Sequence, residues 1–483
     1  MPSLVANSYS TDWFTSRTTI MSLSKDVLLE IFIFYRLSVL RYRDYTWKWQ
    51  TLAHVCSRWR QVILASPGHL DPRLRCTERT PMKEMLDIFP AFPITISYQH
   101  HAPPLHHAPQ DWRNIIAALE IRDQACWISL SGLTSYLLER FAAVMQEPFP
   151  DLTFLELKSN EGSNELMPVL PGTFLGRSAP HLQYLILRGI PFPTLPTILF
   201  SAKDLVSLHL ADIPSTGYIS PMTLATCLFA LPRLTWLIIT FTTPTPPSCR
   251  NGLWPPSQTC PILPSLTTLL FRGVTEYLED LVSRIDAPLL NLVDTQFFDQ
   301  LIFDTPQLFR FIGRARKLRS PKRVTVSFYH NLVKIVLGPQ KAMAGPRHFA
   351  LRISCRGSDR QISSAVQICS QNLSLLSNVE RLDIRGDGYL PPDWQENMNS
   401  TQWIDLLRPF IAVARLHISE RLGPLVVDAL QELAGERTTS VLPALQSLFF
   451  EGLLPSVPGI REAIDPFIAA RHISGLPLAI RWG

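Results

Sequence analysis

The sequence predicts a mixed α/β protein, in which a small N-terminal helical module precedes a curved solenoid of repeats with parallel strands on its concave face. Two amphipathic stretches lie between residues 23 and 63, and a leucine-rich pattern recurs beyond residue 150. The chain of 483 residues also exceeds the usual size of one hydrophobic core. We expect a disordered N-terminus at 1–20, the helical module at 21–66, a linker and transition into the first repeats at 67–147, and the solenoid at 148–483.

Apolar residues at helical spacing predict the helical module. Ser24 is a suitable N-cap, and Asp26 complements the positive start of a helix. One broad apolar face follows, made of Leu23, Val27, Leu28, Ile31, Phe32 and Tyr35. A second stripe steps by three and four residues through Trp49, Leu52, Cys56, Trp59 and Ile63. A hairpin this small cannot bury so wide a face by itself, so we expect something else to cover the surplus.

This segment resembles an F-box, the module with which receptor subunits of ubiquitin ligases bind a Skp-type adaptor. The residues that carry the resemblance are Leu23, Asp26-Val27-Leu28, Ile31-Phe32 and Val55-Cys56-Ser57-Arg58-Trp59-Arg60. Ser24 stands where the family usually has proline, and the connector 36–50 is longer and more aromatic than usual. The resemblance implies adaptor binding through seven side chains: Leu23, Val27, Leu28, Ile31, Phe32, Val55 and Trp59.

Beyond residue 150 one pattern recurs: an apolar residue, two others, leucine, one other, then an apolar residue. Copies begin at Leu152, Leu182, Leu205, Leu234, Leu266, Val379, Val413 and Leu445, and a degraded copy spans Leu289 to Thr295. The intervals, from 23 residues (Leu182 to Leu205) to 34 residues (Val379 to Val413), are typical of stacked units that cannot close a core alone. This half resembles the irregular leucine-rich repeats of fungal F-box proteins. An ordinary α/β domain with leucine-rich strands is the alternative.

Other elements are predicted where the repeat is absent or degraded. We expect a strand at Ile94–Tyr98 and helices at Trp112–Ile121 and Thr134–Met145. Strands are also expected at Arg323–Phe328 and Phe349–Ile353.

The repeat pattern nominates a binding surface. If the motif leucines point into the core, the residues between them line the concave face. Several of these positions are apolar, so either a partner or another part of the chain, such as the insertion Thr242–Pro264, covers them. The residues expected to bind a client protein are Tyr184, Ile186, Trp236, Ile238, Arg272, Arg381 and Arg385.

Residues 305–358 contain twelve Lys or Arg and no Asp or Glu, whereas the chain as a whole has 45 basic and 40 acidic residues. Three interpretations are open. The segment forms a solvated face next to a helix end, or it binds an acidic or phosphorylated segment of the client. Nucleic-acid binding is the third, but the aromatic interleaving and the known motifs are absent.

No catalytic motif is found, so we expect no enzyme activity and no cofactor. The double histidines His100-His101 and His106-His107 lie in a proline-containing stretch, where a solvated loop is expected rather than a metal site. No apolar run is long enough to cross a membrane, and no secretory signal is visible. The eight cysteines form no Cys-x-x-Cys pair, which favours a reduced, cytoplasmic or nuclear protein that is not secreted.

Together the two resemblances imply the substrate-recognition subunit of a Skp-cullin-F-box ubiquitin ligase. The helical module would bind a Skp-type adaptor, and through it a cullin–RING ligase, while the repeats would hold an unidentified client. No nucleic-acid or membrane partner is expected. The alternative is a non-catalytic repeat scaffold whose helical N-terminus is a cap, covered by the chain's own residues within 112–147.

Overall fold

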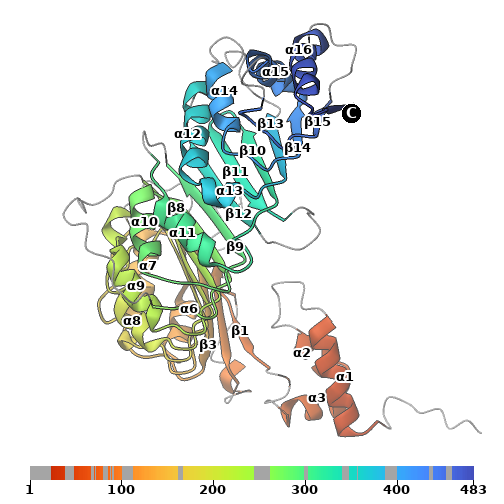
Figure 1. Ribbon diagram of the computed structural model, residues 1–483. Helices are drawn as coiled ribbons and strands as arrows, with labels where there is room; N and C mark the ends of the chain where they lie inside the picture. Colours follow the sequence, from red (N-terminus) through yellow and green to blue (C-terminus); the bar gives the residue numbers. More distant parts are fainter. Residues whose placement is uncertain are drawn as a thin grey trace, which may run out of the picture. The chain divides into compact units, whose positions relative to one another are not determined.

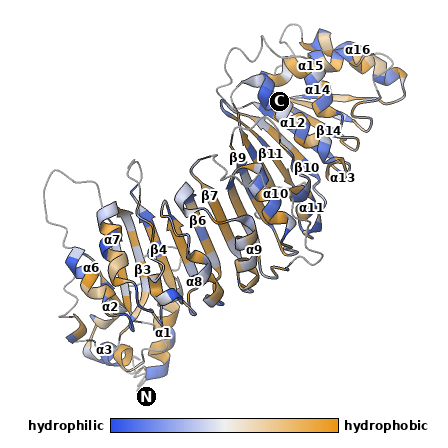
Figure 2. Cartoon of the chain, turned by 90° about the vertical axis from the view of Figure 1, so that its left-hand side faces the viewer, coloured by the Kyte–Doolittle hydropathy of each residue, from blue (hydrophilic) through white to orange (hydrophobic). Residues whose placement is uncertain are grey.

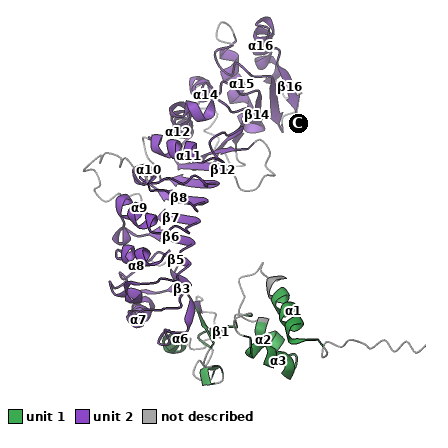
Figure 3. Ribbon diagram, turned by 60° about the horizontal axis from the view of Figure 1, so that its bottom comes forward, with its two compact units in different colours: residues 1–97, 110–118 green, residues 98–109, 119–483 purple. Residues whose placement is uncertain are grey.

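The computed structural model describes residues 23–38, 48–66, 70, 72–79, 85–87, 89, 92–99, 112–160, 167–243, 261–298, 303–339, 348–355, 357–386, 400–434, 439–452 and 460–483. The predictions for 1–20, for the double histidines and for most of Thr242–Pro264 lie outside these residues. The chain divides into two compact units (Figure 3). Unit 1 comprises Met1–Ser97 and Gln110–Ala118, and unit 2 comprises Tyr98–Pro109 and Leu119–Gly483.

Unit 1 begins with the predicted helical module. Its elements are α1 (Lys25–Ser38), α2 (Lys48–Ala53), α3 (Ser57–Leu64), β1 (Leu74–Cys76), the start of β2 (Ile94–Gln99) and most of α6 (Trp112–Leu119). Ser24 caps α1 as predicted, because its Oγ accepts a hydrogen bond from the Val27 amide at 3.3 Å. β1 and β2 pair in parallel.

The second apolar stripe, from Trp49 to Ile63, is divided between two helices, because α2 ends at Ala53 and α3 begins at Ser57. Cys56 has an extended backbone (φ −160°, ψ 168°), and its Sγ accepts a hydrogen bond from the Trp59 amide at 3.4 Å. Cys56 is therefore the N-cap of a new helix, α3. The turn between the helices holds Val55, whose side chain is exposed.

Unit 2 alternates strands with helices (Figure 1). Its strands are β3 (Ala125–Leu133), β4 (Phe154–Ser159), β5 (Tyr184–Arg188), β6 (Ser207–Ile213), β7 (Trp236–Phe241), β8 (Thr268–Gly273), β9 (Leu292–Phe297), β10 (Arg323–Phe328), β11 (Leu332–Gly338), β12 (His348–Ser354), β13 (Arg381–Gly386), β14 (Arg415–Ser419), β15 (Ser447–Glu451) and β16 (Ala479–Trp482). Its helices are α7 (Ser135–Val144), α8 (Leu195–Ser201), α9 (Pro221–Phe229), α10 (Thr275–Ser283), α11 (Pro306–Arg314), α12 (Ser358–Gln371), α13 (Leu373–Leu376), α14 (Ser400–Leu407), α15 (Gly423–Glu432) and α16 (Ile460–Ile473).

The described strands form one mostly parallel sheet of 16 strands. Their order is β1-β2-β3-β4-β5-β6-β7-β8-β9-β12-β11-β10-β13-β14-β15-β16. Each copy of the leucine pattern supplies one of these strands, and the predicted strand Ile94–Tyr98 and both predicted helices in 112–145 are present. Strand β3 between those helices was not predicted. No helix in the described part of the chain has the length and apolar character needed to cross a membrane.

One face of the sheet in unit 2 is covered by helices. The helices α7 to α12 lie along one side of the strands in Figure 3, and the rings of Phe309 (α11) and Phe349 (β12) are 5.4 Å apart. The motif leucines point to this side: Leu155, Leu157 and Leu208 are at most 1% exposed. Both the strands and the helices of unit 2 carry hydrophobic and hydrophilic residues (Figure 2). The alternate strand residues point to the opposite face, which we call the open face.

The prediction of parallel strands throughout is wrong at β11. This strand pairs antiparallel with both β10 and β12, while β12 pairs parallel with β9 and β10 pairs parallel with β13. Residues 329–331, which join β10 to β11, are too few for a crossover connection, so the chain must reverse direction. A hairpin is thus inserted into the parallel array within the basic segment 305–358.

Candidate functional site

The helical module has a core of its own. Leu28 and Phe32 are fully buried, and the Phe32 and Trp59 rings meet edge to face with centroids 4.8 Å apart. The buried cluster consists of Leu28, Leu29, Phe32, Trp49, Leu52, Ala53, Trp59, Val62, Ile63, Leu70, Leu74 and Phe92. Leu70, Leu74 and Phe92 come from the segment that directly follows the module. This segment, and not residues 112–147, covers the described core.

The polar residues of the motif join the helices to one another. The Arg58 guanidinium donates to the Leu23 carbonyl at the start of α1. Arg60 Nε donates to the Ala53 carbonyl at the end of α2 at 3.1 Å, and Trp49 Nε1 donates to the Arg73 carbonyl at 3.0 Å. The bond from Arg60 satisfies the carbonyl of the last residue of α2, and the bond from Arg58 ties α3 to the residues that precede α1.

A row of apolar side chains on α1 stays in water. Val27 is 45% exposed, Ile31 39%, Phe34 74% and Tyr35 39%. Their spacing of four, three and one places them on one side of the helix, which we call the α1 stripe. Val55, in the turn before α3, is 56% exposed.

The seven residues predicted to bind an adaptor therefore separate into two groups. Leu28, Phe32 and Trp59 are buried in the module's own core, and Leu23 is half-buried against it. Val27, Ile31 and Val55 are exposed. Sequence reasoning missed Phe34, although its spacing of three from Ile31 was the available signal.

The open face of unit 2 carries aromatic side chains on successive strands. The Trp127 and Phe154 rings stack with centroids 3.6 Å apart, and Phe154 and Tyr184 are 6.1 Å apart. The strand register continues this row through Ser207 to Trp236. Tyr184 is 40% exposed and Trp236 is 49% exposed, so this row is open to a partner.

The next row on the open face is half-buried and holds three aliphatic side chains and one histidine. Ile186, His209, Ile238 and Leu270 are register neighbours across β5 to β8. Burial and the nearby Lys158 ammonium lower the pKa of His209, so this imidazole is neutral at pH 7. The four apolar client residues predicted from sequence are thus two pairs on the same face, Tyr184 and Ile186 on β5 and Trp236 and Ile238 on β7, and Ser207 and His209 of β6 lie between the pairs. We call these four residues the apolar patch. Arg272, on β8, is exposed and lies over the Phe298 ring at 5.6 Å.

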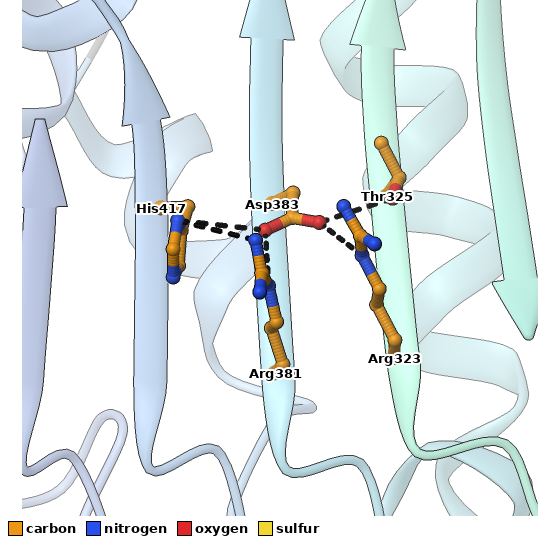
Figure 4. A network of polar contacts seen from close by, with 5 residues as sticks. All are labelled: Arg323, Thr325, Arg381, Asp383 and His417. Atoms are coloured by element: carbon orange, nitrogen blue, oxygen red, sulfur yellow. Dashed lines mark hydrogen bonds and ion pairs between the residues drawn. The ribbon is translucent and has the colours of Figure 1, made fainter. Parts of the chain in front are cut away.

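The character of the open face changes at β10, β13 and β14, where it is polar (Figure 4). Asp383 is fully buried and accepts hydrogen bonds from Arg323 Nε and, at 2.8 Å, from Arg381 Nε. Thr325 donates to the same carboxylate at 3.4 Å. His417 Nδ1 lies 3.3 Å from an Arg381 nitrogen, and burial followed by Arg381 lowers the pKa of His417. One carboxylate therefore fixes two guanidinium groups next to a neutral imidazole.

The basic segment 305–358 does not form one face. Arg314 pairs with Asp286 at 3.1 Å and Lys322 with Glu380 at 2.7 Å, and neither lies on the open face. Lys341, Arg347 and Arg356 lie outside the described residues. Of the nine cations that the structure describes, three project from β10, β11 and β12 onto the open face: Arg323, Lys334 and Arg352.

The fold adds four cations from other strands to these three. We call the combined set the basic face: Arg323, Lys334, Arg352, Arg381, Arg385, Arg415 and Arg481. Two of the predicted client residues, Arg381 and Arg385, belong to it.

No group of three or more His, Cys, Asp or Glu side chains suited to a metal ion occurs among the described residues. Comparison with known protein families and with curated proteins finds no match to this chain.

Proposed function

We propose that this chain is a substrate-recognition subunit of a Skp-cullin-F-box type ubiquitin ligase, which binds a Skp-type adaptor through unit 1 and a client protein through unit 2. The α1 stripe is the observation that carries the proposal. It combines an F-box-like motif with exposed apolar side chains on a module whose own core is already closed. The chain performs no bond chemistry in this role.

The α1 stripe has the composition of a docking surface. Exposed apolar residues scattered singly are ordinary, but Val27, Ile31 and Phe34 lie together on one side of one helix. A large aromatic ring such as Phe34 releases most free energy when a partner removes it from water. Leu28, Phe32 and Trp59 support the helix from behind and keep the stripe in place.

We further propose that unit 2 is a leucine-rich-repeat-like solenoid that holds the client on its open face. The six strands β4 to β9 pair in parallel in chain order, and α8, α9 and α10 connect β5 to β6, β6 to β7 and β8 to β9, which supports this architecture. The apolar patch of Tyr184, Ile186, Trp236 and Ile238 would contact the client. By holding adaptor and client on one chain, the protein would raise the effective concentration of the client at the ligase.

The test uses exposed residues, because polar substitutions at Leu28 or Trp59 would unfold the module. Purified full-length protein is mixed with a purified Skp-type adaptor, and the Kd is measured by calorimetry for the wild type and for Ile31→Glu/Phe34→Glu. We expect the affinity of the double variant for the adaptor to fall tenfold or more, since truncation of such a hot-spot residue costs on the order of 1–4 kcal/mol of binding free energy. Phe229→Glu, at a similarly exposed phenylalanine on α9 (66% against 74% for Phe34), is the control and should bind as the wild type does. Absence of binding by the wild type, or an unchanged Kd in the double variant, would refute the adaptor role.

A repeat scaffold with a helical cap is the second candidate. One observation favours it: Leu70, Leu74 and Phe92 complete the core of the helical module, which is therefore built together with the chain that follows it. A scaffold of this kind would leave the α1 stripe without an adaptor. The calorimetric experiment separates the two candidates, because only the receptor subunit binds the adaptor.

A further inference from the structure

Helices α8 and α9, which lie side by side in unit 2 (Figures 1 and 3), carry no charged residue. Their sequences, LPTILFS and PMTLATCLF, contain no Asp, Glu, Lys, Arg or His. The nearby helices α7 and α10 do, with Glu139 and Arg140 on α7 and three acidic residues on α10. A helix at a protein surface normally presents charged or polar residues to water. The outer side of α8 and α9 therefore differs from that of these two helices.

Large apolar side chains occupy this outer side. Phe200 on α8 is 47% exposed, and Met222 and Phe229 on α9 are 53% and 66% exposed. Met222 and Phe229 lie on the same side of α9, with Thr226 between them, because their spacing is four and three residues. We call Phe200, Met222, Thr226 and Phe229 the α8–α9 surface.

Helix α9 is thus apolar on both of its sides. On the inner side Leu224, Cys227 and Leu228 are at most 1% exposed, and on the outer side Met222 and Phe229 face water. A helix that is hydrophobic all round is typical of a protein interior. We therefore expect a further protein surface to cover its outer side.

The two phenylalanines of the α8–α9 surface occupy equivalent positions in the repeat. Each lies in the last turn of its helix, five residues before the leucine that begins the next copy of the pattern, Leu205 or Leu234. The strands that follow, β6 and β7, pair in parallel, and α8 packs against α9. The two rings therefore lie at the same level of adjacent helices.

This equivalence makes the surface complementary to itself. A twofold axis parallel to the two helices and midway between them places Phe200 of one copy against Phe229 of a second copy, and Phe229 against Phe200. Such an exchange of contacts is what a symmetric dimer requires. Because the centre of the surface is uncharged, no like charges meet at the axis.

The elements on either side of the α8–α9 surface carry opposite charges. The short 3-10 helix η3 (Phe174–Arg177), which packs against α8, has one charged residue, the exposed Arg177. Helix α10, which packs against α9, has three acidic residues and no basic one, and its Glu276 is exposed. The same twofold axis places η3 of one copy opposite α10 of the other. An apolar centre with complementary charges at its rim is the usual anatomy of a protein interface.

We propose that the α8–α9 surface is the interface between two copies of this chain. The surface lies on the helical side of the sheet, opposite the open face of unit 2. The dimer therefore leaves the apolar patch and the basic face uncovered and presents two copies of each. This association is separate from the proposed binding of an adaptor and a client, and it is measured without either of them.

Sedimentation equilibrium of the purified full-length protein tests the proposal over about 1–100 µM, a range that covers dimers of micromolar Kd. The mass of the wild type should rise from that of one chain towards that of two. Phe200→Glu/Phe229→Glu gathers carboxylates at the twofold axis and should dimerise at least tenfold more weakly. Both side chains are exposed, so its circular dichroism should match that of the wild type. Phe200→Ser/Phe229→Ser adds no charge and should also weaken the dimer.

The control is Ile31→Glu/Phe34→Glu, which makes the same change of charge on the α1 stripe, the other exposed apolar row described above. This variant should dimerise within twofold of the wild type. A mass of one chain at every concentration of the wild type, unchanged association of the Phe200→Glu/Phe229→Glu variant, or an equal loss in the control would overturn the proposal.

Discussion

Asp383 shows how one side chain can stabilise a surface that otherwise repels itself. It is fully buried and bonded to Arg323 and Arg381. Removal of one partner from a buried ion pair leaves uncompensated charge in a poorly solvated place. Here two guanidinium groups would face each other without an intervening carboxylate.

We therefore predict that Asp383→Ala lowers the free energy of unfolding by about 3 kcal/mol, the usual cost of breaking a buried pair. Denaturant titration of the full-length protein measures the loss. The control is Asp204→Ala, which removes an exposed pair with Arg233 at 2.7 Å and should change stability little. Similar effects of the two substitutions would show that Asp383 has no special role.

Glu279 is a second residue whose environment controls its ionisation. It lies on α10 and caps α11, accepting hydrogen bonds from the Gln307 and Leu308 amides at 2.8 Å each. Burial raises the pKa of this carboxyl to about 7 from 4.5, and Asp304 adds to the shift, while the two amides and Arg310 oppose it. The effect of burial outweighs that of the cap.

The sign of the pH dependence follows from this raised pKa. The folded protein binds the Glu279 proton more tightly than the unfolded chain does. The protonated carboxyl therefore stabilises the folded state fully below pH 4.5, and this stabilisation is lost as the pH rises through about 7. Between pH 4.5 and pH 7.5 the free energy of unfolding of the wild type should fall by on the order of 1–3 kcal/mol more than that of Glu279→Gln. Melting temperatures of both proteins across this range test the prediction. Parallel pH profiles would contradict it.

At the scale of elements, helix α1 shows which information an amphipathic pattern contains. The sequence predicted one broad apolar face, and the structure divides that face into a buried side with Leu28 and Phe32 and an exposed side with Val27, Ile31 and Phe34. Periodicity identifies the helix and its apolar residues. It does not state which of them neighbouring elements cover, because the covering residues Leu70, Leu74 and Phe92 are distant in sequence.

The two sides of α1 should respond differently to truncation. Leu28→Ala creates a cavity in the core of the helical module and should lower the free energy of unfolding by about 2–5 kcal/mol. Phe34→Ala removes a side chain that is 74% exposed and should change stability by less than about 0.5 kcal/mol, while weakening adaptor binding. Thermal unfolding and calorimetric Kd values for both variants measure the two effects. A large loss of stability in Phe34→Ala would show that this ring belongs to the fold.

At the scale of the whole molecule, the strand array of unit 2 predicts local rather than global responses. Strand β6 pairs only with β5 and β7, and Leu208 on β6 is fully buried. If unit 2 is a solenoid, a cavity at this position destabilises mainly the repeat that contains β6 and the two repeats next to it. Leu208→Ala should therefore increase hydrogen exchange in β5, β6 and β7 and leave β13 to β15 near the wild-type rate. Uniform acceleration throughout unit 2 would indicate one cooperative core instead.

The sequence by itself determined the α/β class, the position of nearly every repeat strand and the residues that face the core, because alternation in strands and helical spacing are local properties. Only the tertiary structure decided the direction of β11, the exposure of Phe34 and the gathering of Arg323, Arg381 and Arg415 into one row. These features depend on which strands pair and on how many residues connect them. Such long-range contacts leave no periodic trace in the chain, which is why the segment 305–358 predicted a basic surface but not its members.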